Sequence, residues 1–343
     1  VPPTATAPAR TTLKERLDMA TYAIDVADAG GLSLGSDADV AGSDRIATDA
    51  AAAGAVAVGG TGDTTITQRS ARTAAPIRFY SAWFCPFAHR AWLALEAKQL
   101  DYQWVECELY DGGPATKKAL SIEEKAQRTP GFVECCPRGL VPGVEHDGIR
   151  VSESLPLIEY LDEAFPECEL RLMPSAPAHR ATVRMWISFA SEKVVPCYYR
   201  MLMAPDEAGR KTAKDDLLSG LRYLSERALS SGEGPYLMGS TFGAFECALF
   251  PHWLRFGSVL RHYRAFELPP GDESLARIVA WGEACTLHPA AAATIVDHKR
   301  IIDSNTGYAD NTATSTAAVN TRAGSGIVGP PQASQPLPAA PRI

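Results

Sequence analysis

The sequence predicts an α/β unit followed by an all-helical unit, and three observations support this. Between residues 76 and 170, short β-branched and aromatic runs alternate with amphipathic runs at helical spacing. Between residues 176 and 303, only amphipathic helical runs follow one another. The flanks, residues 1–75 and 304–343, are rich in small and polar residues, so we expect disordered extensions there, with one stretch of the first, "TLKERLDMATYAIDVADA", that fits an amphipathic helix. An α/β unit followed by helices alone predicts two packed subdomains.

Composition excludes several classes of protein. The chain has 343 residues, of which 46% are apolar and 21% charged, with a net charge of −7, as expected of a globular protein with a core. No basic stripe argues for nucleic acid, and no apolar run approaches the roughly 18 residues of a membrane span. The eight cysteines include no C-x-x-C pair, which favours free thiols and no metal site. We therefore expect a cytoplasmic protein, with organellar targeting left open.

The first strand leads directly into a helix that begins after a cysteine. "IRFYSAWF" (77–84) is typical of a strand, and from Pro86 the apolar residues recur at helical spacing. Proline is favoured as the first helical residue, so Cys85 becomes the N-cap. Its sulfur would meet unpaired N–H groups and the positive end of the helix dipole, which favour the thiolate. This predicts a reactive cysteine; a merely buried residue at the corner is the alternative.

A second strand follows at "YQWVECEL" (102–109), then a polar helical stretch near 115–128. "VPGVEH" and "IRV" indicate two short strands joined by a turn at Asp147 and Gly148. The order strand, helix, strand, helix, strand, strand, helix predicts a thioredoxin-like α/β unit.

The last helix of this unit begins near Ser154, because Pro156 fits only in a first helical turn. Glu153 and Ser154 therefore stand at a helix N-terminus, where free N–H groups can hold an anion. A simple helix cap is the alternative interpretation of these two residues.

Three segments together resemble the cytosolic glutathione transferases, most closely the omega-like class. They are "CPFAHRAWLALEAK", "CPRGLVPGVEHDGIRVSESLPLIEYLDEAFP" and "ECALFPHWLR", and the resemblance covers roughly residues 76–300. It implies the glutathione transferase architecture, with glutathione as co-substrate. The implied partners are a small electrophile, an oxidised small molecule or a glutathionylated protein. A homodimer is one option for the assembly.

The resemblance also implies the chemistry. Cys85 matches the catalytic cysteine that forms a mixed disulfide with glutathione, and Phe87 matches the aromatic residue beside it. Dithiol enzymes need a second cysteine three residues on, where this chain has Ala88. The implied activities are therefore monothiol ones: thiol transfer, dehydroascorbate reduction and deglutathionylation.

The remaining implied site residues hold glutathione. Val141 matches the residue whose backbone pairs with the cysteinyl part, ahead of a cis bond at Pro142. Glu153 and Ser154 match the pair that holds the γ-glutamyl group, where a carboxylate suits the ammonium and a helix N-terminus suits the carboxylate.

The chain departs from the family pattern at two places. Cys135 and Cys136 stand where lysine and asparagine are expected, and they are either bystanders or resolving thiols for the mixed disulfide. Arg138 is then a candidate for the glycine carboxylate of glutathione. Gly243 and Glu246 replace the usual capping pair in the helical unit, and glycine is an acceptable N-cap.

Other candidates have two interpretations each. We expect His89 to face solvent beside Arg90, with a base for the cysteine as the alternative. Trp186, Tyr198 and Tyr199 are either core residues or the lining of a second-substrate cleft.

Two rival classes lack catalysis. One is a binding module that kept the fold, and the other is a chloride-channel-like relative whose first helix region spans a membrane. That region here, "PFAHRAWLALEAKQL", is too polar for a stable span. We also expect both terminal extensions to be dispensable for activity.

Overall fold

The computed structural model describes residues 76–230 and 233–324. Its first part contains a four-stranded mixed sheet with the strand order β2-β1-β5-β6. β1 (Ile77–Ser81) runs parallel to β2 (Tyr102–Glu106) and antiparallel to β5 (Gly143–His146). β6 (Ile149–Ser152) pairs with β5 in antiparallel register, and the predicted turn joins them.

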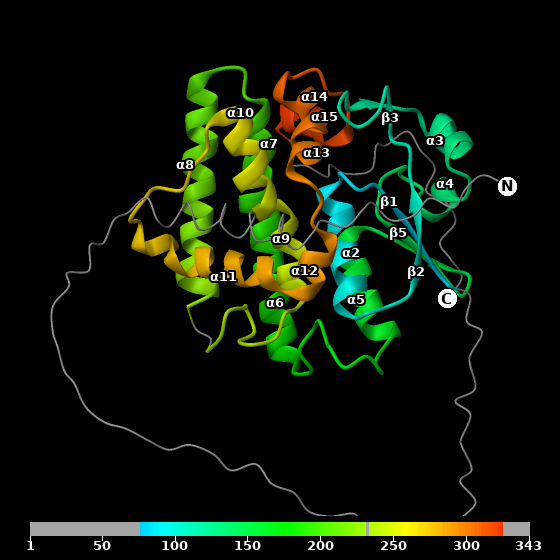
Figure 1. Cartoon of the computed structure of the whole chain (residues 1–343), viewed down its shortest axis with the longest axis horizontal. Helices are drawn as coiled ribbons and strands as arrows, with labels where there is room; N and C mark the ends of the chain where they lie inside the picture. Colours follow the sequence, from blue (N-terminus) through cyan, green and yellow to red (C-terminus); the bar gives the residue numbers. More distant parts are fainter. Residues whose placement is uncertain (1–75, 231–232, 325–343) are drawn as a thin grey trace, which may run out of the picture. The chain divides into compact units, whose positions relative to one another are not determined.

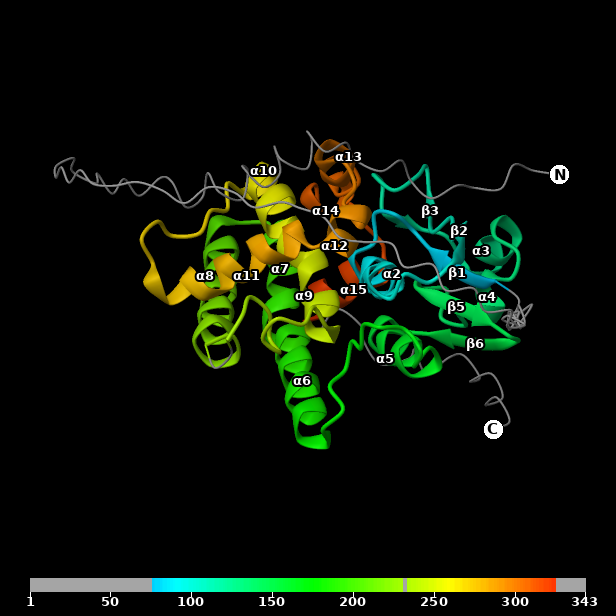
Figure 2. The ribbon, with the colours of Figure 1, turned by 60° about the horizontal axis from the view of Figure 1, so that its bottom comes forward.

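Helices cover both faces of this sheet. α2 (Pro86–Ala97) and α5 (Ser154–Ala164) pack with Phe79 of β1, and α4 (Phe132–Cys135) packs with Tyr80, the next residue of the same strand. Figure 2 shows α2 and α5 between the sheet and the helical region. Successive side chains of a strand point to opposite faces, so one buried strand serves both layers. The predicted α/β unit is confirmed.

The segment after β2 differs from the prediction of one helical stretch near 115–128. β3 (Tyr110–Asp111) and β4 (Lys118–Ala119) form a small hairpin, and only α3 (Ile122–Arg128) is helical. The side chain of Ser121 accepts a hydrogen bond from the backbone N–H of Glu124, the third helical residue, and the Glu124 carboxylate accepts one from the backbone N–H of Ser121. This capping box fixes the start of α3, so the residues before it are free to form the hairpin.

The rest of the described chain is helical, as predicted. Two kinds of break interrupt it: π-helical turns within long helices, and short loops between helices. The elements are α6 (Pro177–Phe189), η1 (Ala190–Val194), α7 (Val195–Met203), α8 (Glu207–Tyr223), η2 (Leu224–Ala228), α9 (Ala244–Arg255), η3 (Phe256–Leu260), α10 (Arg261–Arg264), η4 (Glu273–Leu275), α11 (Ala276–Leu287), α12 (Pro289–Thr294), α13 (His298–Asp303), α14 (Thr306–Ala309) and α15 (Thr316–Ala323).

A buried carboxylate organises the start of α9. Gly243 is the N-cap of this helix, and its backbone N–H donates to Glu246 Oε2 at 2.9 Å. Glu246 Oε1 accepts from the backbone N–H of Leu237 at 2.9 Å and from Trp281 Nε1 at 3.0 Å. The glutamate thus caps the start of α9 through the Gly243 N–H, and its carboxylate also binds Trp281 of α11.

The C-terminal boundary predicted at residue 303 is wrong. Residues 304–324 belong to the folded unit: α14 and α15 pack beside α7, and Tyr308, Ala313 and Ala318 are buried (Figure 1). The helices there are short and the buried residues few, so composition alone resembles a disordered tail. Residues 325–343 and the predicted extension 1–75 lie outside the described residues.

Asp162 of α5 anchors the segment that leads into the helical region. Its buried carboxylate accepts hydrogen bonds from the backbone N–H groups of Leu172 at 2.8 Å and Met173 at 3.2 Å. Oδ1 also lies 3.2 Å from Lys98 Nζ, and neither side chain is exposed. Burial raises the pKa of Asp162, but these donors outweigh burial and hold the pKa below its usual value.

Asp162→Ala is expected to lower the free energy of unfolding by about 3–5 kcal/mol, because it leaves the Lys98 ammonium buried without its partner. Urea unfolding followed by circular dichroism measures the change. Asp215→Ala is the matched control: Asp215 lies 2.6 Å from Lys211 and both side chains are exposed, so we expect a loss below about 1 kcal/mol. Equal losses in both variants would contradict the role given to Asp162.

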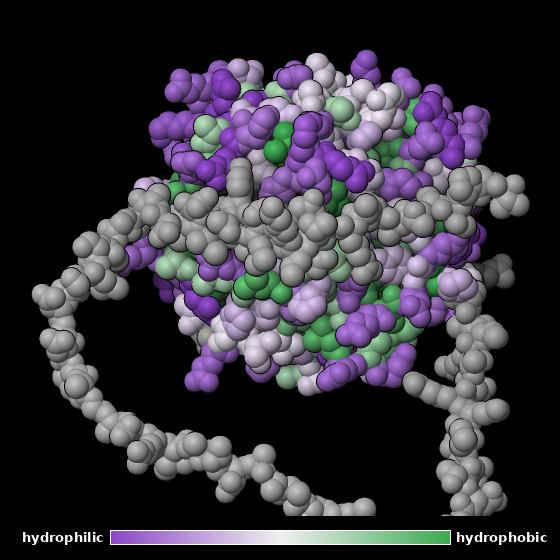
Figure 3. All heavy atoms as spheres, in the orientation of Figure 1, coloured by the Kyte–Doolittle hydropathy of each residue, from purple (hydrophilic) through white to green (hydrophobic). Residues whose placement is uncertain are grey.

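The visible surface in Figure 3 carries mostly hydrophilic side chains, with smaller hydrophobic areas between them. Among the helices of residues 76–230 and 233–324, none has both the length and the apolar character that a membrane span requires.

Candidate functional site

A cavity of about 490 Å³ lies between the sheet unit and the helical region. Its size is within the range of sites for small molecules. Its wall includes all six residues that the sequence singled out: Cys85, Phe87, Val141, Pro142, Glu153 and Ser154. Residues up to 69 positions apart in the chain therefore line one cavity.

Cys85 is the N-cap of α2, as predicted, with extended backbone (φ −82°, ψ 120°) and Pro86 as the first helical residue. The thiol is half-buried on the cavity wall. Burial raises its pKa, while the backbone N–H groups of Ala88 and Phe87, and then the cations Arg255 and Lys117, lower it. Burial outweighs these influences, so the expectation of a lowered pKa from the helix start alone is corrected.

The loop before β5 forms a second wall. The Val141-Pro142 peptide bond is cis, as the resemblance implied. Behind it, Cys135 and Cys136 are buried, and a Cβ atom at Gly143 would overlap the Sγ atoms of both. Within the described residues the two thiols belong to the core under this loop and not to the cavity wall.

The start of α5 forms a third wall. Glu153 has a positive φ of 78°, a conformation that is uncommon outside glycine and is found at functional sites. Its Oε1 accepts a hydrogen bond from Arg138 Nη1 at 2.9 Å, so Arg138 supports this carboxylate from outside the cavity wall of the described chain. Ser154 is buried, and its Oγ accepts from Arg90 Nη1 at 3.4 Å.

Comparisons with known proteins agree on one family. A family model described as the glutathione S-transferase N-terminal domain matches residues 84–164. The chain is 28% identical to glutathione S-transferase omega-1 of Sus scrofa, over 68% of this chain and 87% of that protein. It is 26% identical to the probable glutathione S-transferase parC of Nicotiana tabacum, over 64% of this chain and 90% of that protein.

A solved structure decides the matter. The crystal structure of glutathione transferase Omega 3C from Trametes versicolor is 31% identical, with a TM-score of 0.54. The match covers 64% of this chain and 89% of that one. The chain belongs to the glutathione transferase family. Its omega-class relatives confirm the resemblance drawn from the sequence.

Tyrosines fill the helical side of the cavity of this glutathione transferase. Tyr198 and Tyr199 of α7 are buried and line the cavity wall, which agrees with the interpretation that they line a cleft. Tyr198 OH donates to Asn305 Oδ1 at 3.0 Å. Trp186 instead packs on Phe189 and Tyr223 of the helical region, away from the cavity wall in the described residues.

The transferase buries His89, against the expectation that it faces solvent. Only 5% of His89 is exposed, and its Nε2 lies 2.8 Å from Thr294 Oγ1 of α12. Burial lowers the pKa of His89 well below its usual value, so the ring is neutral at physiological pH. α12 packs against α2, which the helical pattern of α2 by itself does not reveal.

The sequence missed a fourth wall of the transferase site. Lys117 of the hairpin and Tyr308 of α14 both line the cavity. The hairpin and the C-terminal segment are joined by hydrogen bonds from the Thr314 N–H to the Lys117 carbonyl at 3.0 Å and from the Gly307 N–H to the Ala115 carbonyl at 2.8 Å. No local pattern connects positions so far apart in the chain.

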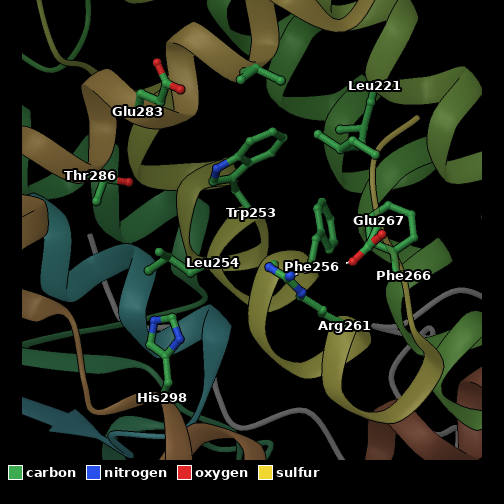
Figure 4. Close-up of a pocket in the computed structure, with 13 residues that line it drawn as sticks. Leu221, Trp253, Leu254, Phe256, Arg261, Phe266, Glu267, Glu283, Thr286 and His298 are labelled. Carbon is green, nitrogen blue, oxygen red and sulfur yellow. Dashed lines mark ion pairs between the residues drawn. The ribbon is translucent and has the colours of Figure 1, made fainter. Parts of the chain in front are cut away.

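A second cavity of about 90 Å³ lies within the helical region of the transferase (Figure 4). Its wall includes Trp253, Phe256 and Phe266, and Arg261 lies 3.6 Å from Glu267 beside it. None of the described residues on this wall is a cysteine.

Proposed function

We propose that this glutathione transferase is a glutathione-dependent monothiol thioltransferase and dehydroascorbate reductase. The observation that carries the proposal is the cavity wall, where Cys85 stands at a helix start among residues suited to glutathione. The proposed substrates are glutathionylated thiols and small oxidised molecules.

The proposed reaction has two steps. The Cys85 thiolate attacks the glutathione sulfur of a mixed disulfide, so that a new sulfur–sulfur bond forms and the other partner leaves as a thiol after taking up a proton. A second glutathione then attacks the Cys85 adduct, releasing oxidised glutathione and the free cysteine. The substrate mixed disulfide is reduced to a thiol, and one free glutathione is oxidised by joining the glutathionyl group of the substrate in oxidised glutathione.

The surroundings of Cys85 support release by a second glutathione. Ala88, one turn further along α2, is fully buried, and Cys135 and Cys136 lie in the core beneath the Pro142 loop. Cys85 is the single cysteine among the described residues of the cavity wall. An internal disulfide would require one of the buried thiols to leave the core.

The α5 start supports binding of the γ-glutamyl group. The Glu153 carboxylate suits its ammonium, and the helix N-terminus with the Ser154 hydroxyl suits its carboxylate. Arg138 holds Glu153 in place, and Arg90 stands behind Ser154.

Glu153→Gln is expected to weaken glutathione binding by about 1–3 kcal/mol, the scale of a charge-assisted hydrogen bond lost. Isothermal titration calorimetry measures the affinity. Glu163→Gln, in the same helix and paired with Arg180 at 2.6 Å, is the control and should bind as wild type does. Equal affinity for all three proteins would mean that Glu153 only shapes the helix start.

The wild-type enzyme tests the proposal as a whole. We expect glutathione-dependent reduction of hydroxyethyl disulfide and of dehydroascorbate, and little conjugation of glutathione to chlorodinitrobenzene. Conjugation without disulfide reduction would indicate an ordinary transferase. Glutathione binding without either activity would favour a binding module.

The proposal includes a cytoplasmic location, supported by the eight cysteines without a C-x-x-C pair, since free thiols persist in reducing compartments.

A further inference from the structure

Three buried cations surround Cys85. Arg90, Lys117 and Arg255 are each 2–3% exposed. Within residues 76–230 and 233–324, none of them forms an ion pair with a carboxylate. Buried charges are normally paired, so the positive charge around Cys85 is suited to a thiolate or a bound anion.

The two arginines are held by backbone oxygens. Arg90 Nε donates to the Ala248 carbonyl at 2.7 Å. Arg255 donates from Nη2 to the Phe84 carbonyl at 3.0 Å and from Nη1 to the Pro251 carbonyl at 2.6 Å. These contacts explain their positions without reference to a ligand.

Lys117 is held differently, in a box of aromatic rings. Its Nζ lies 4.1 Å from the ring centre of Phe84, 5.0 Å from that of Tyr110 and 5.5 Å from that of Tyr308. Ring faces attract an ammonium but accept no proton from it. The rings belong to three separate segments, Phe84 directly precedes Cys85, and Lys117 and Cys85 line the same cavity.

The backbone at Lys117 is also fixed. Its φ is 52°, an uncommon value for a residue with a side chain, and its carbonyl accepts the hydrogen bond from Thr314. Strained residues of this kind are retained where the surrounding structure requires the position.

The thiol and the amine influence each other. Burial lowers the pKa of Lys117 to about 7; Cys85 acts in the opposite direction and Arg255 adds to the lowering. Lys117 in turn lowers the pKa of Cys85 against the effect of burial. The charged form of each group therefore favours the charged form of the other.

Among the other groups facing the pair, the tyrosines and Arg90 keep one charge state. Burial raises the pKa of the cavity tyrosines, so they stay neutral, and it lowers the pKa of Arg90 only to about 10, so Arg90 stays charged. The charged and titratable groups of the wall and its surroundings are Arg90 of α2, Tyr110 of β3, Glu153 before α5, Glu192 of η1, Tyr198 and Tyr199 of α7, His252 and Arg255 of α9 and Tyr308 of α14.

We propose that Lys117 is the positioning residue that ionises Cys85: the ammonium in the aromatic box stabilises the thiolate, and the thiol ionises as half of a thiolate–ammonium pair. The role of Lys117 in turnover rests on the proposed function, whereas its effect on the ionisation of Cys85 does not.

The test is the pH dependence of alkylation of Cys85 by iodoacetamide, followed by peptide mass spectrometry, in wild type, Lys117→Met and Lys117→Arg. Lys118→Met is the matched control, because Lys118 is the exposed neighbour in the same hairpin. Between about pH 6 and 7.5 we expect Lys117→Met to slow labelling of Cys85 at least tenfold, since the lost charge raises the pKa of the thiol by about one unit or more. Lys118→Met should follow the wild-type profile, and Lys117→Arg, whose charge persists above pH 7, should label Cys85 at least as fast as wild type.

A Lys117→Met profile that superimposes on wild type would overturn the inference. Unchanged alkylation together with a raised KM for glutathione in Lys117→Met would also overturn the inference. Lys117 would then bind a glutathione carboxylate. Thermal unfolding checks that the variants are folded; should Lys117→Met be unfolded, Lys117→Gln replaces it. Alkylation needs no glutathione, so a wild type without disulfide reductase activity but with the expected shift would reject the proposed function and keep this inference.

Discussion

Cys85→Ser is expected to lower glutathione-dependent reduction of hydroxyethyl disulfide at least about 100-fold, a loss of about 2.7 kcal/mol in transition-state stabilisation. A serine hydroxyl cannot form the mixed disulfide through which the proposed reaction passes. No other described residue of the cavity wall carries a thiol that could replace it. Coupled oxidation of NADPH by glutathione reductase measures the rate.

Cys168→Ser is the matched control, because Cys168 is the other cysteine that is only partly buried and it lies away from the cavity wall. Its activity should equal that of wild type. Activity that survives in Cys85→Ser but disappears in Cys168→Ser would move the reactive thiol elsewhere.

Truncation after Asp303 is expected to lower kcat/KM for disulfide reduction at least about tenfold, or about 1.4 kcal/mol. It removes Tyr308, which closes the box around Lys117 and lines the cavity, and Asn305, the partner of the Tyr198 hydroxyl. Loss of a buried aromatic side chain costs about 3–5 kcal/mol of stability, so the unfolding midpoint should fall as well. Steady-state kinetics and urea unfolding measure the two effects.

Truncation after Gly324 is the control, since it keeps α14 and α15 and should preserve activity and stability. Tyr308→Ala tests the same wall in a chain of full length. Unchanged activity after removal of residues 304–343 would restore the original expectation that the C-terminal segment is dispensable. Removal of residues 1–75 stays a separate prediction.

The sequence predicted those parts of the fold and site that depend on neighbours in the chain. Pro86 after a strand marks the start of α2, and Pro156 restricts the start of α5, so Cys85 and Glu153 could be placed at helix N-termini. The Asp147-Gly148 turn fixed the pairing of β5 with β6, because both residues have the positive φ that a tight hairpin needs.

Contacts between distant segments could not be predicted. Lys117 and Tyr308 are 191 positions apart. Lys117 lies in a stretch predicted to be a polar helix, and Tyr308 lies in a stretch whose composition resembles a disordered tail. The burial of His89 depends on α12, which a helical pattern in α2 does not reveal. The balance of influences on the Cys85 thiol likewise needs the depth of the cavity, which only the packed structure supplies.

The central claim is that Cys85 carries glutathione as a mixed disulfide, and intact-mass spectrometry after incubation with oxidised glutathione tests it most directly. We predict a single glutathione adduct on wild type, located on the peptide that contains Cys85, and no adduct on Cys85→Ser. Dithiothreitol should remove the adduct. An unmodified wild-type protein, or an adduct on another cysteine with Cys85 free, would contradict the claim.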